Sequence, residues 1–217
     1  MTKTETIDII VHGTASGPDY HRLVTILALK NVPWSFSPRP PAILKGLCDD
    51  FPIMQYGPCY FEGSIIATLA LEQLQPNPSL FPNGNCGMPL ALSWWSDSFY
   101  KSGNDPALLQ KNCVLISRQI ADGRYFLQGA TPGLADVHSF APLKALQHDG
   151  HDISSVLKAD SLLQSWYQRM DQLAPGGKTA TLPRISSTDY PECDLISDKI
   201  ILKDSHIILW KNSFPKK

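Results

Sequence analysis

The sequence predicts a small α/β domain followed by an all-helical domain. In the first eighty residues, short strand-like and helix-like segments alternate in the order βαβ and then ββα. A stretch rich in proline and glycine follows between Gln75 and Met88, and beyond it helical patterns recur without a strand signal until the last thirty residues. We therefore expect domains at residues 1–80 and 88–183, with a C-terminal extension at 184–217.

The first strand and helix of the α/β domain have clear signals. The β-branched run IDIIVH at residues 7–12 predicts a strand, and the glycines and proline of GTASGPDYH mark a turn into a helix. Along that helix, residues that would form one face recur at spacings of three and four. Asn31 is a suitable residue to end the helix. The stripe consists of Leu23, Ile26, Leu27 and Lys30. The segment VPWSFSP then predicts the second strand.

The second half of the domain begins with a hairpin. Two short apolar runs in FPIMQYGPCYFEG, residues 52–55 and 59–61, flank the turn pair Gly57–Pro58. A helix with an apolar repeat of four follows, and we expect Ser64 as its N-cap.

Four segments predict helices in the second domain, and the tail predicts a hairpin. The helical segments are SWWSDSFY, LLQKNCVLISRQIA, LADVHSFAPLKALQ and LLQSWYQRMDQLA. In the extension, the short runs IILK and HIILW flank the turn pair Asp204–Ser205. We expect this tail to pack near a ligand cleft or a dimer partner.

Composition excludes several classes of function. A formal charge of -1 in 217 residues provides no basic excess for nucleic acid or anionic membranes. No apolar run is long enough for a signal peptide or a membrane span, so we expect a cytoplasmic protein. The cysteines lack the spacing of a zinc site or a disulfide framework, so free thiols and no metal are expected. They are Cys48, Cys59, Cys86, Cys113 and Cys193.

Three segments resemble the glutathione S-transferase superfamily, in which a thioredoxin-like domain precedes a helical domain. PIMQYGPCYFEGS is similar to the family stretch in which a cis-proline opens the third strand and a serine begins the next helix. FLQGATPGLADVHSFAPL resembles the helical-domain capping motif, and LLQSWYQRMDQLAPGGK resembles the closing helix. The resemblance covers about residues 5–180 and implies a glutathione-dependent enzyme that is a homodimer.

The resemblance also implies a glutathione site. It assigns Pro52 as the cis-proline, Ile53 as the residue whose backbone pairs with the cysteinyl part, and Ser64 as a holder of the γ-glutamyl carboxylate at a helix N-terminus. Ser64 as a plain helix cap is the alternative. Relatives carry Glu or Gln at the position of Gly63, so one ligand contact is missing. Glu62 is one residue early and is expected on the other face.

Several residues are candidates for the group that activates the glutathione thiol. Relatives place Ser, Cys or Tyr in the first strand-to-helix turn, where this chain has Gly17. The candidate catalytic residues are therefore Ser16 first, then Tyr20, with Thr14 as a further neighbour. Ser16 as a turn former is the alternative, and we expect Asp19 to be a helix cap.

An apolar second ligand is expected against the first helix of the helical domain. Its aromatic residues are Trp94, Trp95, Phe99 and Tyr100, which cannot all share one face. We expect half of them to pack and half to line a pocket, with a dimer face as the alternative. Asp136 matches the acidic residue of the capping motif, where Gly133 replaces the usual hydroxyl residue and Thr131 is the expected substitute.

Two functions follow from these residues. The first is an enzyme that conjugates or isomerises an electrophilic apolar small molecule with glutathione. The second is a catalytically silent protein that binds an apolar ligand or a protein partner. Gly17 and Gly63 favour the second, whereas Pro52, Ser64 and the aromatic helix favour the first.

Overall fold

The protein divides into two compact units. A computed structural model describes residues 9–48, 51–84, 87–173, 197–202 and 207–212. Within these residues, the first unit contains 9–15, 26–78 and two C-terminal strands, and the second contains 16–25 and 79–173. The C-terminal extension therefore contributes to the α/β unit.

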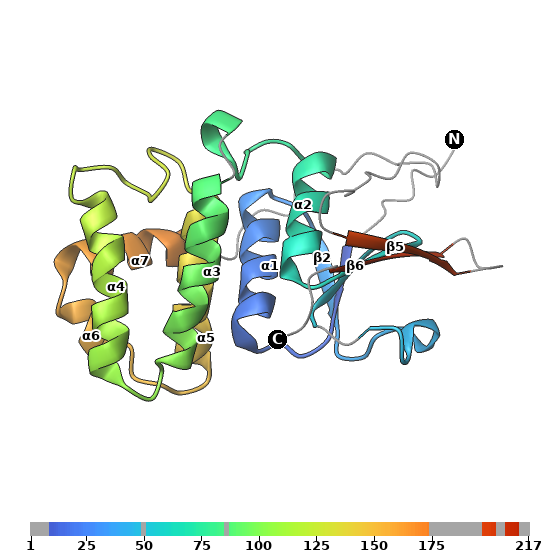
Figure 1. Ribbon diagram of the computed structural model, residues 1–217, viewed down its shortest axis with the longest axis horizontal. Helices are drawn as coiled ribbons and strands as arrows, with labels where there is room; N and C mark the ends of the chain where they lie inside the picture. Colours follow the sequence, from blue (N-terminus) through green and yellow to red (C-terminus); the bar gives the residue numbers. More distant parts are fainter. Residues whose placement is uncertain (1–8, 49–50, 85–86, 174–196, 203–206, 213–217) are drawn as a thin grey trace. The chain divides into compact units, whose positions relative to one another are not determined.

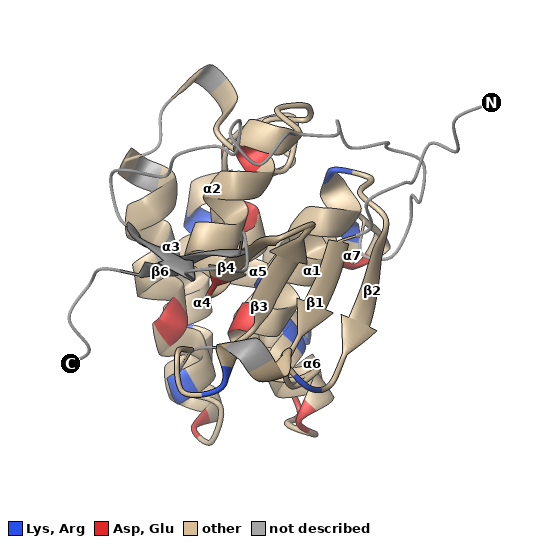
Figure 2. Ribbon diagram, turned by 90° about the vertical axis from the view of Figure 1, so that its right-hand side faces the viewer, with Lys and Arg blue, Asp and Glu red and all other residues tan. Residues whose placement is uncertain are grey.

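A six-stranded mixed sheet forms the first unit, in the order β2-β1-β3-β4-β6-β5. Strands β1, β2, β4 and β6 run in one direction, while β3 and β5 run antiparallel to their neighbours. Figure 2 shows β2, β1 and β3 side by side. The strands are β1 (Ile9–His12), β2 (Trp34–Ser37), β3 (Ile53–Tyr56), β4 (Cys59–Glu62), β5 (Ser197–Leu202) and β6 (Ile207–Asn212).

Both hairpins predicted from the sequence are present. Strands β3 and β4 flank the Gly57–Pro58 turn, and β5 pairs with β6 along six residues of each strand. The extension was expected near a cleft or a dimer partner. Its strand β6 pairs in parallel with β4, so the hairpin covers what would otherwise be an edge of the sheet.

One face of the sheet carries an unbroken apolar layer. Alternate residues of three neighbouring strands lie opposite one another in register and are fully buried. Helix α2 (Ser64–Leu74) packs on β3, β4 and β6. A second apolar cluster of Leu44, Ile53 and Tyr60 includes the short helix η1 (Ala42–Leu44). The buried layer consists of Ile9, Val11, Met54, Tyr56, Cys59 and Phe61.

Helix α1 (Gly17–Leu29) ends as its sequence predicts. Asn31 has a positive φ of 54°, a left-handed conformation that asparagine tolerates and that stops a helix. The stripe residues Leu23, Ile26 and Leu27 are fully buried. Lys30 belongs to the same stripe and is also fully buried, although it is charged.

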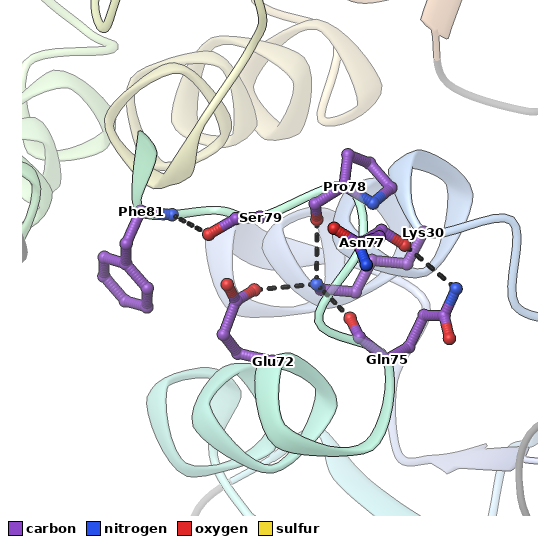
Figure 3. A network of polar contacts seen from close by, with 7 residues as sticks. All are labelled: Lys30, Glu72, Gln75, Asn77, Pro78, Ser79 and Phe81. Atoms are coloured by element: carbon purple, nitrogen blue, oxygen red, sulfur yellow. Dashed lines mark hydrogen bonds and ion pairs between the residues drawn. The ribbon is translucent and has the colours of Figure 1, made fainter. Parts of the chain in front are cut away.

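The buried Lys30 ties the end of α1 to the end of α2. Its Nζ donates to Glu72 Oε2 at 2.7 Å, to the Gln75 carbonyl at 2.6 Å and to the Pro78 carbonyl at 3.0 Å (Figure 3). The carbonyl of Gln75 follows the C-terminus of α2, where the helix dipole favours a cation. A single ammonium group thus joins α1, α2 and the segment that leaves the first unit.

The second unit is helical. Helix α3 packs against α5, and α4 packs against α6 and α7 (Figure 1). Residues 154–158 form a short helix that the sequence patterns did not predict. The elements are η2 (Pro82–Gly84), α3 (Gly87–Lys101), α4 (Pro106–Ile120), α5 (Leu134–His148), α6 (Ser154–Lys158) and α7 (Ser161–Leu173). Among the described helices, none combines the length and apolar character needed to cross a bilayer.

Candidate functional site

The candidate site of the first unit lies at one end of its sheet. Strands β1, β2, β4 and β6 all point their carboxyl ends toward this end, and β3 begins there. The turn after β1, the start of β3 and the junction from β4 to α2 therefore meet. Ligands commonly bind at such carboxyl ends of parallel strands because loops and helix N-termini converge there.

A cis Phe51–Pro52 bond opens β3, as the resemblance implies. The Pro52 carbonyl accepts a hydrogen bond of 3.0 Å from the Gly63 N–H, which joins the start of β3 to the start of α2. At Gly13, an added Cβ would lie 2.9 Å from Phe51 Cδ1. The turn after β1 therefore packs directly on the residue before the proline.

The position of Ile53 requires a correction. Ile53 pairs with His12 of β1 on one side and with Glu62 of β4 on the other, and its side chain is fully buried. An additional strand cannot pair with a residue whose two neighbouring positions are already filled. Phe51 precedes the ladder, so its backbone is the better candidate for such pairing.

Gly63 and Ser64 form the N-terminus of α2. The N-cap is Gly63, with φ 81°, and Ser64 is the first helical residue, so the expectation that Ser64 is the N-cap is wrong by one position. No side-chain cap closes this end of the helix. A Cβ at Gly63 would meet nothing within 4 Å, and glycine is required there because of the positive φ. The junction is thus a helix N-terminus with the polarity to favour a carboxylate.

Two side chains beside this junction are buried. Ser64 is 3% exposed, and its carbonyl accepts from Thr68 Oγ1 at 2.6 Å. Glu62 is 2% exposed. Because it pairs with Ile53 and lies two residues from Tyr60, Glu62 is on the sheet face that carries the Leu44 cluster. The structure thus brings Pro52, Gly63 and Ser64 together at one end of the sheet, with a carboxylate next to them.

Ser16 and Tyr20 belong to the second unit. Ser16 is exposed and directly precedes α1, and Thr14 is exposed two residues earlier. Tyr20 is half-buried, and burial raises the pKa of its phenol above its usual value, which keeps the phenol protonated as a hydrogen-bond donor. Both Ser16 and Tyr20 therefore carry a hydroxyl near the start of α1.

The aromatic residues of α3 have distinct environments. Trp94 is 60% exposed, whereas Trp95 is half-buried and packs edge-to-face on Phe99 with ring centroids 4.6 Å apart. Phe99 is fully buried, and Tyr100 donates its hydroxyl to Asp149 Oδ2 at 2.6 Å. Phe99 is therefore a core residue of the second unit, and Tyr100 anchors α3 to the end of α5. Trp94 and Trp95 retain surface that a ligand can reach.

A buried arginine in the second unit, Arg22, was not among the site residues predicted from the sequence. The Arg22 side chain is 6% exposed and forms ion pairs with Asp19, at 3.0 Å, and with Asp97 of α3. Burial, followed by the nearby Arg22 charge, lowers the pKa of His138 well below its usual value. The i, i+3 spacing of Asp19 and Arg22 could have indicated the first pair. Asp19 is thus a partner of Arg22 in the first turn of α1.

Two further histidines differ in environment. Burial, then the charges of His148 and Lys144, lowers the pKa of His21 to about 4. His12 contacts Gln55 Oε1 through Nε2 at 2.7 Å and the Arg39 carbonyl through Nδ1 at 3.1 Å. Both are packing residues.

The capping motif of α5 has the predicted acidic residue, but the side chain that caps the helix N-terminus is not the predicted one. Asp136 Oδ2 accepts from the Gly133 N–H at 3.1 Å, and its Oδ1 accepts from the Leu127 N–H and from Trp166 Nε1. Gln128 Oε1, and not Thr131, accepts from the Ala135 N–H at 2.9 Å. A Cβ at Gly133 would lie 2.2 Å from that oxygen. Gln128 therefore fills the space of the usual cap side chain.

Among the cysteines, Cys59 and Cys113 are buried and Cys48 is half-buried. Burial raises the pKa of Cys113 to about 12, so this thiol is not activated. Cys86 and Cys193 lie outside the described residues.

Comparisons with known proteins support the fold. Neither a protein-family model nor a curated protein matches the sequence. A GST-like protein from Pseudomonas syringae matches with 16% identity and a TM-score of 0.72, over 95% of this chain and 96% of that chain.

Two other solved structures match over less of the chain. A maleylacetoacetate isomerase from Anaeromyxobacter dehalogenans, solved with dicarboxyethyl glutathione and citrate in its active site, has 16% identity and a TM-score of 0.56, over 82% of this chain and 96% of that one. A glutathione S-transferase from Rhodospirillum rubrum has 17% identity and a TM-score of 0.57, over 81% and 96%. The chain therefore has the glutathione S-transferase-like fold that its sequence predicts.

Proposed function

We propose that this protein binds glutathione at the open end of its sheet and uses it to conjugate or isomerise an electrophilic apolar small molecule. The observation that carries the proposal is the hydrogen bond from the Gly63 N–H to the Pro52 carbonyl, which holds the N-terminus of α2 beside the start of β3. The isomerase from Anaeromyxobacter dehalogenans, which has the same fold, was solved with a glutathione derivative.

Three features of the first unit support the binding of glutathione. The first turn of α2 and the Ser64 hydroxyl hold the γ-glutamyl carboxylate, because the partial positive charge of a helix N-terminus favours an anion. The backbone of Phe51 pairs with the extended cysteinyl part. The open space at Gly63 leaves room for the ligand where relatives carry a side chain.

Glutathione supplies the nucleophilic thiol in this chemistry. Ser16 is the first candidate to donate a hydrogen bond that favours the thiolate, and Tyr20 is the second, because its raised pKa keeps it a donor. Trp94 and Trp95 offer apolar surface to the second substrate. A homodimer in the cytoplasm remains part of the proposal.

Isothermal titration of the purified protein with glutathione tests this assignment. We expect binding, and we expect Ser64→Ala to weaken it about tenfold or more, as the loss of a hydrogen bond to a charged group implies. Ser155→Ala is the matched control, since Ser155 is an exposed serine of the short helix α6. The absence of binding at millimolar glutathione would exclude the cofactor.

A catalytically silent binding protein is the second candidate, and the glycine at position 17 favours it. Gly17 begins α1 and provides no hydroxyl to the thiol, while the neighbouring Thr14 and Ser16 side chains are exposed to water. The ultraviolet absorbance of the bound thiolate separates the two functions. An enzyme shows thiolate at neutral pH that Ser16→Ala or Tyr20→Phe reduces, whereas a silent protein binds glutathione as the thiol.

A further inference from the structure

His12 is a buried histidine whose two ring nitrogens both face oxygen atoms that accept hydrogen bonds. It is the last residue of β1, and it is 4% exposed. Its Nε2 lies 2.7 Å from Oε1 of Gln55 on β3, and its Nδ1 lies 3.1 Å from the carbonyl oxygen of Arg39. A neutral imidazole carries a single N–H and can donate only one hydrogen bond. Two donated bonds therefore require the doubly protonated ring.

The Gln55 amide presents its oxygen to His12 because its nitrogen is already engaged. Gln55 Nε2 donates to the carbonyl oxygen of Gly57 at 3.1 Å. Turning the amide over would place Oε1 against that carbonyl and would lose this hydrogen bond. The carbonyl of Arg39 accepts in either case, and it also accepts from Ser37 Oγ at 2.8 Å. Both partners of His12 are thus acceptors.

The titratable groups around His12 leave room for a positive charge. The ring of Tyr60 on β4 lies 6.3 Å away between centroids, and burial raises the pKa of its phenol above the usual value, so the phenol stays neutral. Glu62 of β4 pairs with Ile53, which pairs with His12, so the backbones of Glu62 and His12 are about 10 Å apart. Arg39 is exposed to water and contributes its carbonyl oxygen. The doubly protonated ring thus faces two acceptors, a neutral phenol and a more distant carboxylate.

The hydrogen bonds of His12 tie β1 and β3 to the segment that follows β2. His12 pairs with Ile53 in the ladder between β1 and β3, and the next residue, Gly13, donates its N–H to the Ser37 carbonyl at 3.0 Å. Gly13 also packs on Phe51, the residue before the cis-proline. His12 therefore lies directly beside the turn after β1 and the start of β3, which are two of the three parts of the candidate site.

We propose that doubly protonated His12 is a positioning residue for the glutathione site, and that the loss of one ring proton weakens glutathione binding. This inference rests on the proposed function and extends it by making the binding depend on pH. Histidine changes its charge within the range of about pH 5–8. At the alkaline end of this range, one ring nitrogen of His12 faces an acceptor without a proton, and a buried hydrogen bond is lost. Glutathione affinity then falls, because the ligand must restore the arrangement of the turn and of β3.

NMR of the ring nitrogens tests the protonation of His12 without any ligand. We expect both nitrogens to carry slowly exchanging protons at about pH 5, and one of them to lose its proton as the pH rises toward about 8. Gln55→Glu replaces the amide by a carboxylate that only accepts, so this variant should keep His12 doubly protonated to higher pH. A ring with a single N–H throughout this range, or no effect of Gln55→Glu, would overturn the inference.

Isothermal titration with S-methylglutathione, which has no thiol to titrate, measures the consequence at the site. From about pH 5 to about 8 we expect the affinity of the parent protein to fall about three- to tenfold, the worth of one hydrogen bond. His12→Leu should bind weakly and nearly independently of pH, whereas Gln55→Glu should retain the higher affinity to higher pH. His151→Gln is the matched control with the pH dependence of the parent, because His151 is a partly exposed histidine of the other unit.

The outcomes separate this inference from the proposed function. An affinity of the parent protein that is constant with pH, or a pH dependence that persists in His12→Leu, would overturn the role of His12 and leave the glutathione site intact. Gln55→Glu keeps the imidazole and decides the question by itself if His12→Leu does not fold. If the parent protein binds S-methylglutathione at no pH, the proposed function fails and the role of His12 at the site fails with it, whereas the NMR result still decides whether the ring is doubly protonated.

Discussion

Replacing Lys30 with methionine should destabilise the protein by about 3 kcal/mol. Methionine keeps most of the apolar stem but removes the ammonium group that three acceptors share at 2.6–3.0 Å. Breaking a buried ion pair costs about 3–5 kcal/mol because the remaining charge loses its partner. The lower end applies here, since the Glu72 side chain is 18% exposed and can regain water.

Thermal and urea unfolding, followed by circular dichroism, measure this loss. For a chain of this size, about 3 kcal/mol lowers the melting temperature by roughly 6–12 °C. Lys45→Met is the matched control, because Lys45 is an exposed lysine of the same unit. The double variant Lys30→Met/Glu72→Met should recover part of the stability, since it leaves no unpaired charge. A loss below about 1 kcal/mol, equal to that of the control, would refute the reasoning.

The pH dependence gives a second readout of the same residue. Burial lowers the pKa of Lys30 below its usual value, and the hydrogen bond and charge of Glu72 oppose that shift in part. Between the lowered pKa and the ordinary value of 10.5, the unfolded chain binds more protons than the folded one. The stability of the parent protein should therefore rise with pH in this window. Lys30→Met should remove that rise.

Three further predictions concern other sites. His21, with a pKa of about 4, should cost the fold about 1.4 kcal/mol per pH unit as the pH falls from 6.5 toward 4, and urea unfolding of His21→Gln should show a smaller loss. Gln128→Ala should destabilise the second unit by about 1 kcal/mol, because the Ala135 N–H loses its acceptor, as thermal melts of the variant and the parent protein would show. The thiol of Cys113 should resist labelling in the folded protein and react once the chain is unfolded in urea; equal labelling rates in the two states, read by peptide mass spectrometry, would contradict the burial.

Local patterns predicted most of the secondary structure. The β-branched runs, the Gly57–Pro58 turn and the stop at Asn31 depend on residues that are neighbours in the chain, so their signals survive without tertiary information. The short helix α6 was missed because five residues are too few to show a helical period. The N-cap of α2 moved from Ser64 to Gly63 because the positive φ at the junction favours glycine over a side-chain cap.

The site was predicted less completely than the fold. The resemblance identified Pro52, Gly63 and Ser64, and the structure joins them at one end of the sheet. It misassigned the strand-pairing role to Ile53, because sequence spacing does not show that both neighbouring positions of β3 are filled. Phe99 belongs to the aromatic run but is fully buried, which the helical period of a single segment could not decide.

By itself, the sequence determined the element order, the turns and the resemblance to a fold, because these depend on short-range propensities and recognisable motifs. Only the tertiary structure decided which distant groups meet. In the sequence, Lys30 occupies one position of an otherwise apolar stripe. Its acceptors lie 42 to 48 residues further along the chain. The tail reads as a hairpin, but its place beside β4 depends on a backbone ladder between residues more than 140 positions apart. Backbone hydrogen bonds do not depend on the identity of the side chains, so no sequence pattern could predict that pairing.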